Sequence, residues 1–245
     1  MNYNKKYYPI NWTEGMKLNK DIFIAQDNAI FDSLSLTAST TLSPIKYGLL
    51  PHSNFNVSVS VDNQGTARVT VNACKALTLG GFYIDIDASN TSAVDGNPSV
   101  SMGISNSTHA TLFWAVLLVL PYERVPFGNI DPNESPARFP FIQAAYDVLL
   151  IEENQIAQYS QQPHSLIIGK IKSTGNSFIV DDNYLPPCIS VSASQDLMGL
   201  HAELDSFLAT LEQNCSIIVQ KIYKKSQQNE LSELAKFLCD RVILF

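Results

Sequence analysis

Residues 185–204 read LPPCISVSASQDLMGLHAEL, and the spacing of the apolar residues changes within this stretch. Upstream, apolar and polar residues alternate, as they do in half-buried strands, whereas downstream the apolar residues recur at steps of three and four, as on one face of a helix. Pro186 and Pro187 interrupt the first pattern, and Ser192 or Ser194 can cap the helix that follows. The sequence therefore predicts strands up to about residue 185 and helix after residue 194.

The upstream part contains seven runs with the alternation or continuous apolar character of strands. They are FNVSVSV at 55–61, TARVTVNA at 66–73, FYIDID at 82–87, LFWAVLLVL at 112–120, YDVLLIEE at 146–153, SLIIGKIK at 165–172 and SFIVDD at 177–182. NQG at 63–65 predicts a hairpin turn, and Ile189 with Val191 predicts a last short strand. Pro121 is expected to end the run at 112–120, and the proline-rich segment 121–140 to be a long ordered loop.

The downstream part has the pattern of two amphipathic helices joined by a turn at SQQN, 226–229. The first has a narrow apolar seam, of the kind that packs on other helices, and Asn214 interrupts it. The second carries a shorter seam and runs to the end of the chain at VILF. The seam residues are Leu197, Leu200, Leu204, Phe207, Leu211 and Ile218 in the first helix, and Leu231, Leu234 and Leu238 in the second.

Composition excludes several functional classes. The chain has 245 residues, a formal net charge of -7 and 16% charged residues, and this acidic balance does not favour nucleic-acid binding. The N-terminal sequence lacks the apolar core of a secretory signal, and the longest apolar run is far shorter than the ~20 residues that cross a bilayer. The four cysteines are widely spaced without metal-ligand motifs, so we expect free thiols, no bound metal and a reducing compartment.

Candidate catalytic residues are sparse. Asp85 and Asp87 share one face of a predicted strand, as two metal ligands could, but no third ligand follows at a suitable spacing, and a solvent-facing sheet surface explains them better. A glycosidase would need Asp147 with Glu152 or Glu153, yet adjacent residues on a strand point to opposite faces. The histidines are dispersed and no glycine-rich phosphate loop precedes a helix. The sequence therefore predicts neither an enzyme nor a cofactor.

INWTEGMKL at 10–18 precedes a segment, 19–36, with helical spacing. We interpret Trp12 and Leu18 as apolar anchors and Gly15 as a turn residue. For Glu14 two interpretations stay open: a hydrogen-bonded carboxylate that fixes the turn, or a direct contact with a partner.

Two of these motifs resemble the TssK family, baseplate subunits of bacterial type VI secretion systems. INWTEGMKL is similar to the family's W-x-E/D-G-x-x-L motif, carried here by Trp12, Glu14, Gly15 and Leu18. NYLPPCISVSASQDLMGLHAEL at 183–204 is similar to the family's Pro-Pro strand with the Ser-Ala-Ser and apolar helix that follow. ALTLGGFYIDI departs from the family's usual Pro-Asp-Gly turn, which points to a divergent branch.

The resemblance implies a mainly β fold, a β-sandwich shoulder followed by a C-terminal α-helical hairpin or bundle. It divides the chain into an N-terminal segment, 1–18, that packs on the helical part, a shoulder, 19–187, and the start of a bundle, 188–245. It further implies a cytoplasmic homotrimer formed through the helical seam. In that family the shoulder docks on the TssF/TssG wedge, and a C-terminal head reaches the membrane complex. The resemblance extends over the shoulder and the first helices only, so we expect this chain to be a fragment without the head, the alternative being a naturally shortened homologue.

Two other kinds of function stay open at this stage. A carbohydrate-binding or phage receptor-binding-like β-sandwich would use exposed aromatic side chains as stacking platforms, with Tyr7, Tyr8, Phe82 and Tyr83 as the candidates. A glycosidase would need a pair of carboxylates ~5 to 9 Å apart.

Overall fold

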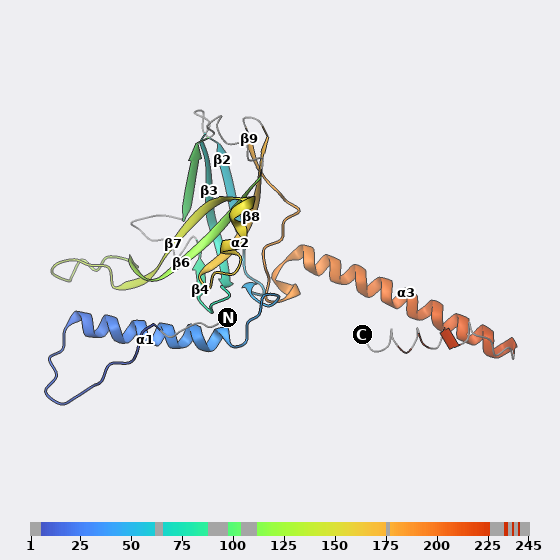
Figure 1. Ribbon diagram of the computed structural model, residues 1–245, viewed down its shortest axis with the longest axis horizontal. Coiled ribbons are helices and arrows are strands. Elements are labelled where there is room, and N and C mark those ends of the chain that lie inside the picture. The colour runs from blue at the N-terminus through green and yellow to red at the C-terminus, as the bar shows by residue number, and fades with distance from the viewer. Residues whose placement is uncertain are drawn as a thin grey trace. The chain divides into compact units, whose positions relative to one another are not determined.

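The structure is a computed structural model that describes residues 6–61, 66–87, 98–103, 112–174 and 177–225, together with positions 233, 234, 237 and 240. The chain divides into two compact units, Met1–Ala193 and Ser194–Phe245. Figure 1 shows the elements of both units. They are α1 (Lys20–Ser39), β1 (Gly48–Leu49), β2 (Asn56–Val61), β3 (Thr66–Leu77), β4 (Tyr83–Ile86), β5 (Ser99–Gly103), β6 (Leu112–Phe127), β7 (Phe141–Glu152), η1 (Glu153–Gln155), α2 (Ile156–Tyr159), β8 (Ser165–Thr174), β9 (Ser177–Val180), η2 (Val191–Ala193) and α3 (Gln195–Lys225).

Helix α1 begins where the sequence predicts it. Asn19 is the N-cap: its backbone is extended, and its side-chain oxygen accepts a hydrogen bond from the backbone N–H of Ile22 at 3.0 Å. This bond satisfies one of the N–H groups that the first turn leaves without a partner. The helix runs three residues beyond the predicted limit at Leu36.

The first sheet is built around β3. Strands β1, β2, β4 and β5 each pair with β3, and all these pairs are antiparallel. Asn56 pairs with Ala73 but Val57 pairs with Val71, so Asn72 is an extra residue on β3. Such a bulge moves the inward-facing positions by one residue. Accordingly, the buried residues of β3 are odd-numbered before the bulge, as Val69 and Val71 are. After the bulge they are even-numbered, as Cys74 and Ala76 are.

The second sheet has the strand order β7-β6-β8-β9 and is antiparallel throughout. Residues at alternate positions of β6, such as Phe113 and Leu117, enter the main core, while Val116 on the opposite face is also buried. Ile156 and Tyr159 of the short helix α2 pack on that opposite face. Strand β6 is therefore covered on both faces, which explains its continuous apolar run.

Strand β6 continues through Pro121, so the prediction that this proline ends the strand is wrong. The pairing with β7 runs to Leu120 and resumes at Arg124, which places Pro121 inside an irregularity where a ladder hydrogen bond is not required of it. Pro126 lies beyond Leu118, where β8 stops pairing with β6 and only one side of β6 is bonded. The predicted loop at 121–140 is therefore shortened to 128–140, between β6 and β7.

The predicted short strand at Ile189 and Val191 is also wrong. Only one parallel bridge forms, between Leu49 and Cys188, and a turn of 3-10 helix follows. The hydroxyl of Ser190 accepts from the backbone N–H of Ser192 at 3.3 Å, and the backbone of Ala193 donates to the carbonyl of Ser190 at 3.0 Å. Such local bonds compete with strand pairing, and prolines just upstream cannot donate to a ladder.

One hydrophobic core takes side chains from both sheets. Val69 and Ile84 of the first sheet pack in the same cluster as Leu117 and Ile168 of the second. The seven strand runs predicted at 55–182 are all present as strands, although their limits differ by several residues. The predicted turn at 63–65 lies outside the described residues. The β-rich character of the first unit is thereby confirmed.

The second unit contains α3 over Gln195–Lys225, and the described part between residues 197 and 212 holds no strand. The predicted change from strand to helix after residue 194 is therefore confirmed. Of the predicted second helix, only Glu233, Leu234, Phe237 and Asp240 are described, each as helical. Within the described chain, no helix is both long enough and apolar enough to span a bilayer.

Gly48 is expected to be indispensable for the connection between β1 and the segment that leads to α3. Its φ is +106°, and a Cβ there would lie 1.9 Å from the carbonyl oxygen of Pro187. The Pro187 carbonyl also accepts a hydrogen bond from Leu49 N at 2.7 Å, so it cannot simply retreat. We expect Gly48→Ala to lower the free energy of unfolding by about 3 kcal/mol, through left-handed strain and the displaced backbone, in a urea titration.

Gly15→Ala is the matched control. Gly15 also has a positive φ, +79°, but an added Cβ would meet nothing within 4 Å. Strain alone should then lower the free energy of unfolding by about 1 kcal/mol. Equal losses in the two variants would contradict the close packing of Gly48 on Pro187.

Among the described cysteines, the less buried are expected to react with thiol reagents before the more buried. Cys74, Cys188 and Cys215 are free thiols, and Cys74 and Cys215 are buried. Burial raises the pKa of Cys74 to about 12, so only about one thiol in 10,000 is ionised at pH 8. Burial also raises the pKa of the half-buried Cys188. In the native protein, a disulfide-exchange reagent should modify Cys188 first and Cys74 only as fast as the core opens.

Unfolded protein without reductant should titrate all four cysteines of the sequence, Cys239 included. Mass spectrometry identifies which thiol has reacted at each time. A disulfide in the purified protein, or modification of native Cys74 as fast as Cys188, would disprove this assignment.

Candidate functional site

A fully buried carboxylate, that of Asp32 on α1, holds three elements together. Its Oδ2 accepts hydrogen bonds from the backbone N–H groups of Lys6, at 2.6 Å, and Tyr7, at 3.0 Å. Its Oδ1 accepts from the hydroxyl of Tyr122 on β6 at 2.7 Å. The rings of Tyr7 and Tyr122 lie 4.5 Å apart, with the ammonium of Lys6 over both. The N-terminal segment, α1 and β6 are therefore joined through one side chain.

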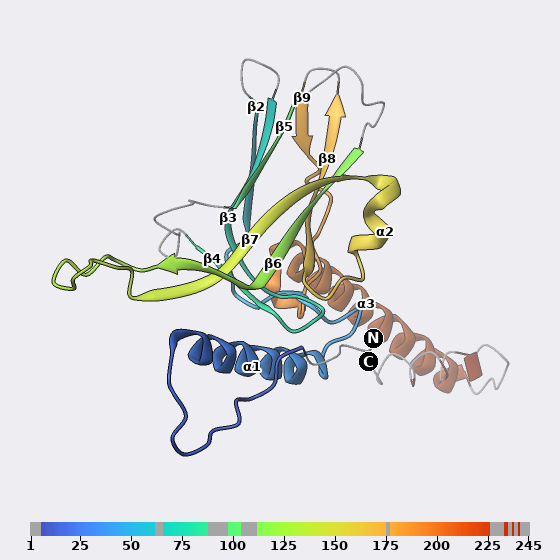
Figure 2. The same cartoon turned by 60° about the vertical axis from the view of Figure 1, so that its left-hand side comes forward.

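A second polar connection fastens α1 to the hairpin of β6 and β7. Arg124 donates from Nη2 to the carbonyl of Ile24 at 3.2 Å and to Oδ1 of Asn28 at 3.0 Å. Its Nη1 lies 3.3 Å from Oδ2 of Asp27. In Figure 2 the hairpin of β6 and β7 extends above α1. The Nε of Arg124 is buried and has no hydrogen-bond acceptor among the described residues.

Helix α1 buries polar side chains and exposes large apolar ones, which is the opposite of an ordinary surface helix. Its buried positions include the polar residues Asn28, Asp32 and Ser35. Its outward positions carry large apolar side chains that are about half exposed, namely Phe23, Ile30, Phe31 and Leu34, which we call the α1 apolar face. Surface helices normally turn such residues inward, and an exposed apolar patch of this kind marks an interaction site.

A cavity of about 360 Å³ opens beside this face. Its walls come from α1, from the residues that lead into β4, and from β6 and β7. They include Phe31, Leu34, Phe82, Val119, Arg124 and Ile142. The lining is mainly apolar with one cationic side chain, so the cavity suits an apolar group that also carries a hydrogen-bond acceptor.

The predicted anchors of the N-terminal motif are exposed in the single chain. Trp12 is 50% and Leu18 57% exposed. Gly15 has the left-handed backbone of the predicted turn, which the bond from Met16 N to the carbonyl of Thr13, at 3.2 Å, closes. Glu14 is exposed, and within the described part of the chain no hydrogen bond to its carboxylate fixes the turn. The second interpretation, a contact between Glu14 and a partner, stays a prediction.

The Pro-Pro motif connects the two units. In the parallel bridge, the N–H of Leu49 donates to the carbonyl of Pro187, and the N–H of Ile189 donates to the carbonyl of Leu49. The thiol of Cys188 donates to the carbonyl of Pro186. Ser192 uses its hydroxyl in a 2.9 Å contact with the hydroxyl of Ser190. The carbonyl of Ser194 accepts from the N–H of Met198 at 3.1 Å, which is the first turn of α3.

The predicted seam of α3 is largely exposed in the described chain. Leu200, Leu204 and Phe207 are each more than half exposed, whereas Leu197 and Leu211 are partly covered. In the second part of the seam, Leu234 is exposed, and Leu231 and Leu238 lie outside the described residues. An exposed stripe of leucine and phenylalanine on a helix calls for a covering partner.

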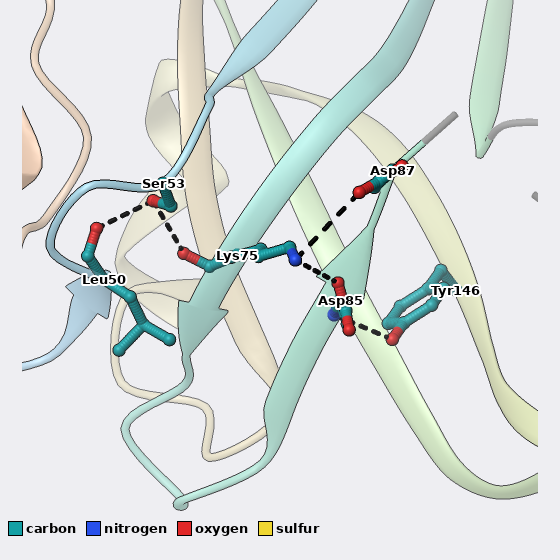
Figure 3. Close-up of polar contacts among 6 residues, drawn as sticks. All are labelled: Leu50, Ser53, Lys75, Asp85, Asp87 and Tyr146. Carbon is teal, nitrogen blue, oxygen red and sulfur yellow. Dashed lines mark hydrogen bonds and ion pairs between the residues drawn. The ribbon is translucent and has the colours of Figure 1, made fainter. Parts of the chain in front are cut away.

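The candidate carboxylate pair in the first sheet is bridged by a lysine. Figure 3 shows Lys75 on β3 reaching across to Asp85, at 3.5 Å, and Asp87, at 4.0 Å. Lys75 and Asp85 are directly opposite in the strand pairing, and the backbone N–H of Asp85 donates to the hydroxyl of Tyr146 on β7 at 3.2 Å. Burial raises the pKa of Tyr146. The cluster is therefore a cross-strand ion pair that joins the edges of the two sheets.

The candidate glycosidase carboxylates do not form a matched pair. Asp147 and Glu152 are both on β7, five residues apart, which is about 17 Å along a strand. A glycosidase needs roughly 5 to 9.5 Å. Within the described residues, no group of three or more His, Cys, Asp and Glu side chains is placed to hold a metal ion.

The four aromatic residues considered as sugar platforms do not form one surface. Tyr8 and Tyr83 are exposed, but Tyr7 packs on Tyr122 and Phe82 is buried. The inclusion of Phe82 was therefore wrong: its ring lies in the core, 4.5 Å from that of His164. Burial lowers the pKa of His164, with the charge of Lys6 adding to the shift. This histidine is a packing residue.

The residues that organise this region, Asp32, Tyr122 and Arg124, were missed from the sequence. A usable signal was present in the helical segment 19–36, where Asn28, Asp32 and Ser35 recur at steps of four and three. Polar residues at that spacing share one face of a helix.

Comparisons with known proteins agree with this architecture. Residues 133–243 match the model of a family of bacterial type VI secretion proteins that includes EvfL, ImpJ and VasE. No curated protein sequence matches the chain. A crystal structure of TssK shares the fold with a TM-score of 0.62 and 16% identity, over 97% of this chain.

Two larger assemblies contain similar chains. One is the baseplate complex of a type VI secretion system, with a TM-score of 0.53 and 16% identity over 97% of this chain and 76% of that one. The other is a TssK-TssF-TssG baseplate subcomplex, with a TM-score of 0.52 and 17% identity over 96% of this chain and 80% of that one. The chain spans 56% of the length of the TssK chain in the crystal structure. The resemblance to the TssK family is confirmed, by the fold across nearly the whole chain and by the family model over residues 133–243.

Proposed function

We propose that the chain is a structural component of a type VI secretion baseplate, equivalent to the shoulder and the first part of the helical bundle of TssK. The observation that carries this proposal is the family match over residues 133–243, which runs from the second sheet into the helical unit. The shared fold over 97% of the chain supports it independently. Catalysis, a cofactor and nucleic-acid binding have no part in the proposal.

The proposed domains are an N-terminal segment, 1–18, a β-sandwich shoulder, 19–187, and the start of a bundle, 188–245. The common core of the two sheets supports a sandwich, because facing sheets bury their inner side chains against each other. The compact units divide after Ala193, close to the proposed start of the bundle. The bonds from Lys6, Tyr7 and Ile10 to α1 tie the N-terminal segment to the first unit.

The proposed partners follow from the resemblance. The shoulder would dock on a TssF/TssG wedge, since a similar chain is part of a solved TssK-TssF-TssG subcomplex. In the family that the chain resembles, a C-terminal head makes the link to the membrane complex, and the assembly would lie in the cytoplasm. The test is co-purification of this chain with the TssF and TssG proteins of the same genome. Retention of both supports the proposal, and retention of neither at micromolar concentration contradicts it.

The proposed oligomer is a trimer assembled through the α3 seam. Leu200, Leu204 and Phe207 keep more than half of their surface exposed in the single chain. Burying several such side chains at roughly 1.5 to 3 kcal/mol each would outweigh the cost of association. Lysine and glutamate are absent from these positions, as expected of a helical seam.

We expect the double substitution Leu204→Asp and Leu211→Asp to dissociate this trimer, because it places two charges in the seam. Light scattering should give three times the 27.1 kDa chain mass for the unmodified protein and one chain mass for the variant. Circular dichroism should retain the strand signal of the first unit.

Ser206→Asp with Gln213→Asp is the matched control, since it adds the same charge at the same spacing to exposed polar positions of α3. This control should stay trimeric. Equal masses for the unmodified protein and the seam variant would show that the seam is not the oligomer contact.

A further inference from the structure

The N-terminal loop, residues 11–18, is a projection that hydrogen bonds fasten at both ends. On its N-terminal side, Ile10 N donates to Oε1 of Gln26 at 3.1 Å, and Lys6 and Tyr7 bind Asp32. On its C-terminal side, Asn19 caps α1. In Figure 2 the loop swings away from α1 between these two attachments. A loop fastened at both ends loses little conformational entropy when its tip binds a partner.

The tip of this loop carries the kind of side chain that anchors interfaces. Trp12 is half exposed, and tryptophan is among the residues enriched at binding hot spots. The other exposed apolar residue of the loop, Leu18, lies next to the α1 cap. Nothing within the described chain covers either side chain fully, so both are available to a neighbour.

The cavity beside α1 offers the complementary shape and charge. Its volume of about 360 Å³ is in the range of pockets that hold a small ligand or a large side chain. Phe31 and Leu34 belong both to the cavity wall and to the α1 apolar face, so the cavity opens onto that exposed face. Arg124 supplies the cationic group of the lining, where its Nη1 also lies 3.3 Å from the half-exposed carboxylate of Asp27. Glu14, two residues from Trp12, is an exposed carboxylate that can meet this charge.

We infer that Trp12 of one copy of the chain inserts into the α1 cavity of the next copy, with Glu14 facing Arg124 there. This inference rests on the homo-oligomer proposed above and gives it a second contact, in the β-rich unit. A projection and a cavity on the same chain form a heterologous contact, and successive contacts of that type close into a ring when the rotation between copies closes, as it does in a trimer.

The exposed apolar surface is large enough for this contact. Half-exposed aromatic and large aliphatic side chains each leave on the order of 100 Å² uncovered. In one such contact, Trp12 and Leu18 come from one copy, and the α1 apolar face with Phe141 and Ile142 of β7 comes from the next. Together these side chains offer roughly 800 Å² of apolar surface, which is close to the apolar share of a standard interface of ~1,600 Å² in total.

The test replaces Trp12 by the photoreactive aromatic residue p-benzoylphenylalanine in the full chain. Irradiation of the assembled protein should give a product of two chain masses on a denaturing gel. Mass spectrometry should place the cross-link on peptides that line the cavity, around Leu34 or Ile142. The same photoreactive residue at Ile45, which is 94% exposed on a turn before β1, is the control and should give no such product.

The outcomes separate this inference from the proposed function. If light scattering shows an oligomer but the cross-link is absent or maps away from the cavity, the inference is overturned and the seam trimer stands. If the unmodified protein is a monomer, both the inference and the trimer fall. If Trp12 cross-links only to an added TssF or TssG protein, the loop is part of the wedge contact and the second-copy assignment is wrong.

The contribution of Trp12 to the stability of the oligomer can be measured by dilution. Trp12→Ala should raise the concentration at which the oligomer half dissociates roughly 30-fold, as expected for the loss of a hot-spot side chain. Ile45→Ala removes an apolar side chain that is more exposed than Trp12 and should leave that concentration unchanged. Equal midpoints for the two variants would contradict the inference.

Discussion

The buried carboxylate of Asp32 determines how the first unit presents its surface. Because Asp32 binds the backbone of Lys6 and Tyr7 and the hydroxyl of Tyr122, α1 must turn its polar side inward. Asn28 and Ser35 share that side. An unpaired buried carboxylate is costly, so these bonds and the orientation of α1 depend on each other. The apolar residues of α1 are consequently left facing outward.

Both units leave large apolar side chains exposed, but they do so by different means. In the first unit, polar bonds hold α1 so that Phe31 and Leu34 face outward beside a cavity, while a separate core takes its side chains from both sheets. In the second unit, α3 leaves Leu204 and Phe207 exposed along one seam. Both surfaces have the character of assembly interfaces, which agrees with the structural role proposed above.

The sequence predicted the strands, α1 and α3 because these elements obey simple periodicity. It failed where a local exception overrides the general rule. Pro121 lies at an irregularity of the ladder, so β6 continues through it, and the hydroxyls and prolines around Ser190 prevent a last strand. Motif similarity located Trp12, but only the structure shows that it is exposed and that the loop around it is fastened. The cavity could not be predicted, because its walls come from segments about 100 residues apart.

The central claim is that the outward apolar residues of α1 and α3 are covered by other copies or partners in the working assembly. Hydroxyl-radical footprinting of the purified protein, read by mass spectrometry at Phe23, Phe31, Leu34, Leu204 and Phe207, measures this directly. The account predicts that these side chains are protected at high protein concentration and become reactive on dilution. Full reactivity at every concentration, and in the presence of TssF and TssG proteins, would contradict it.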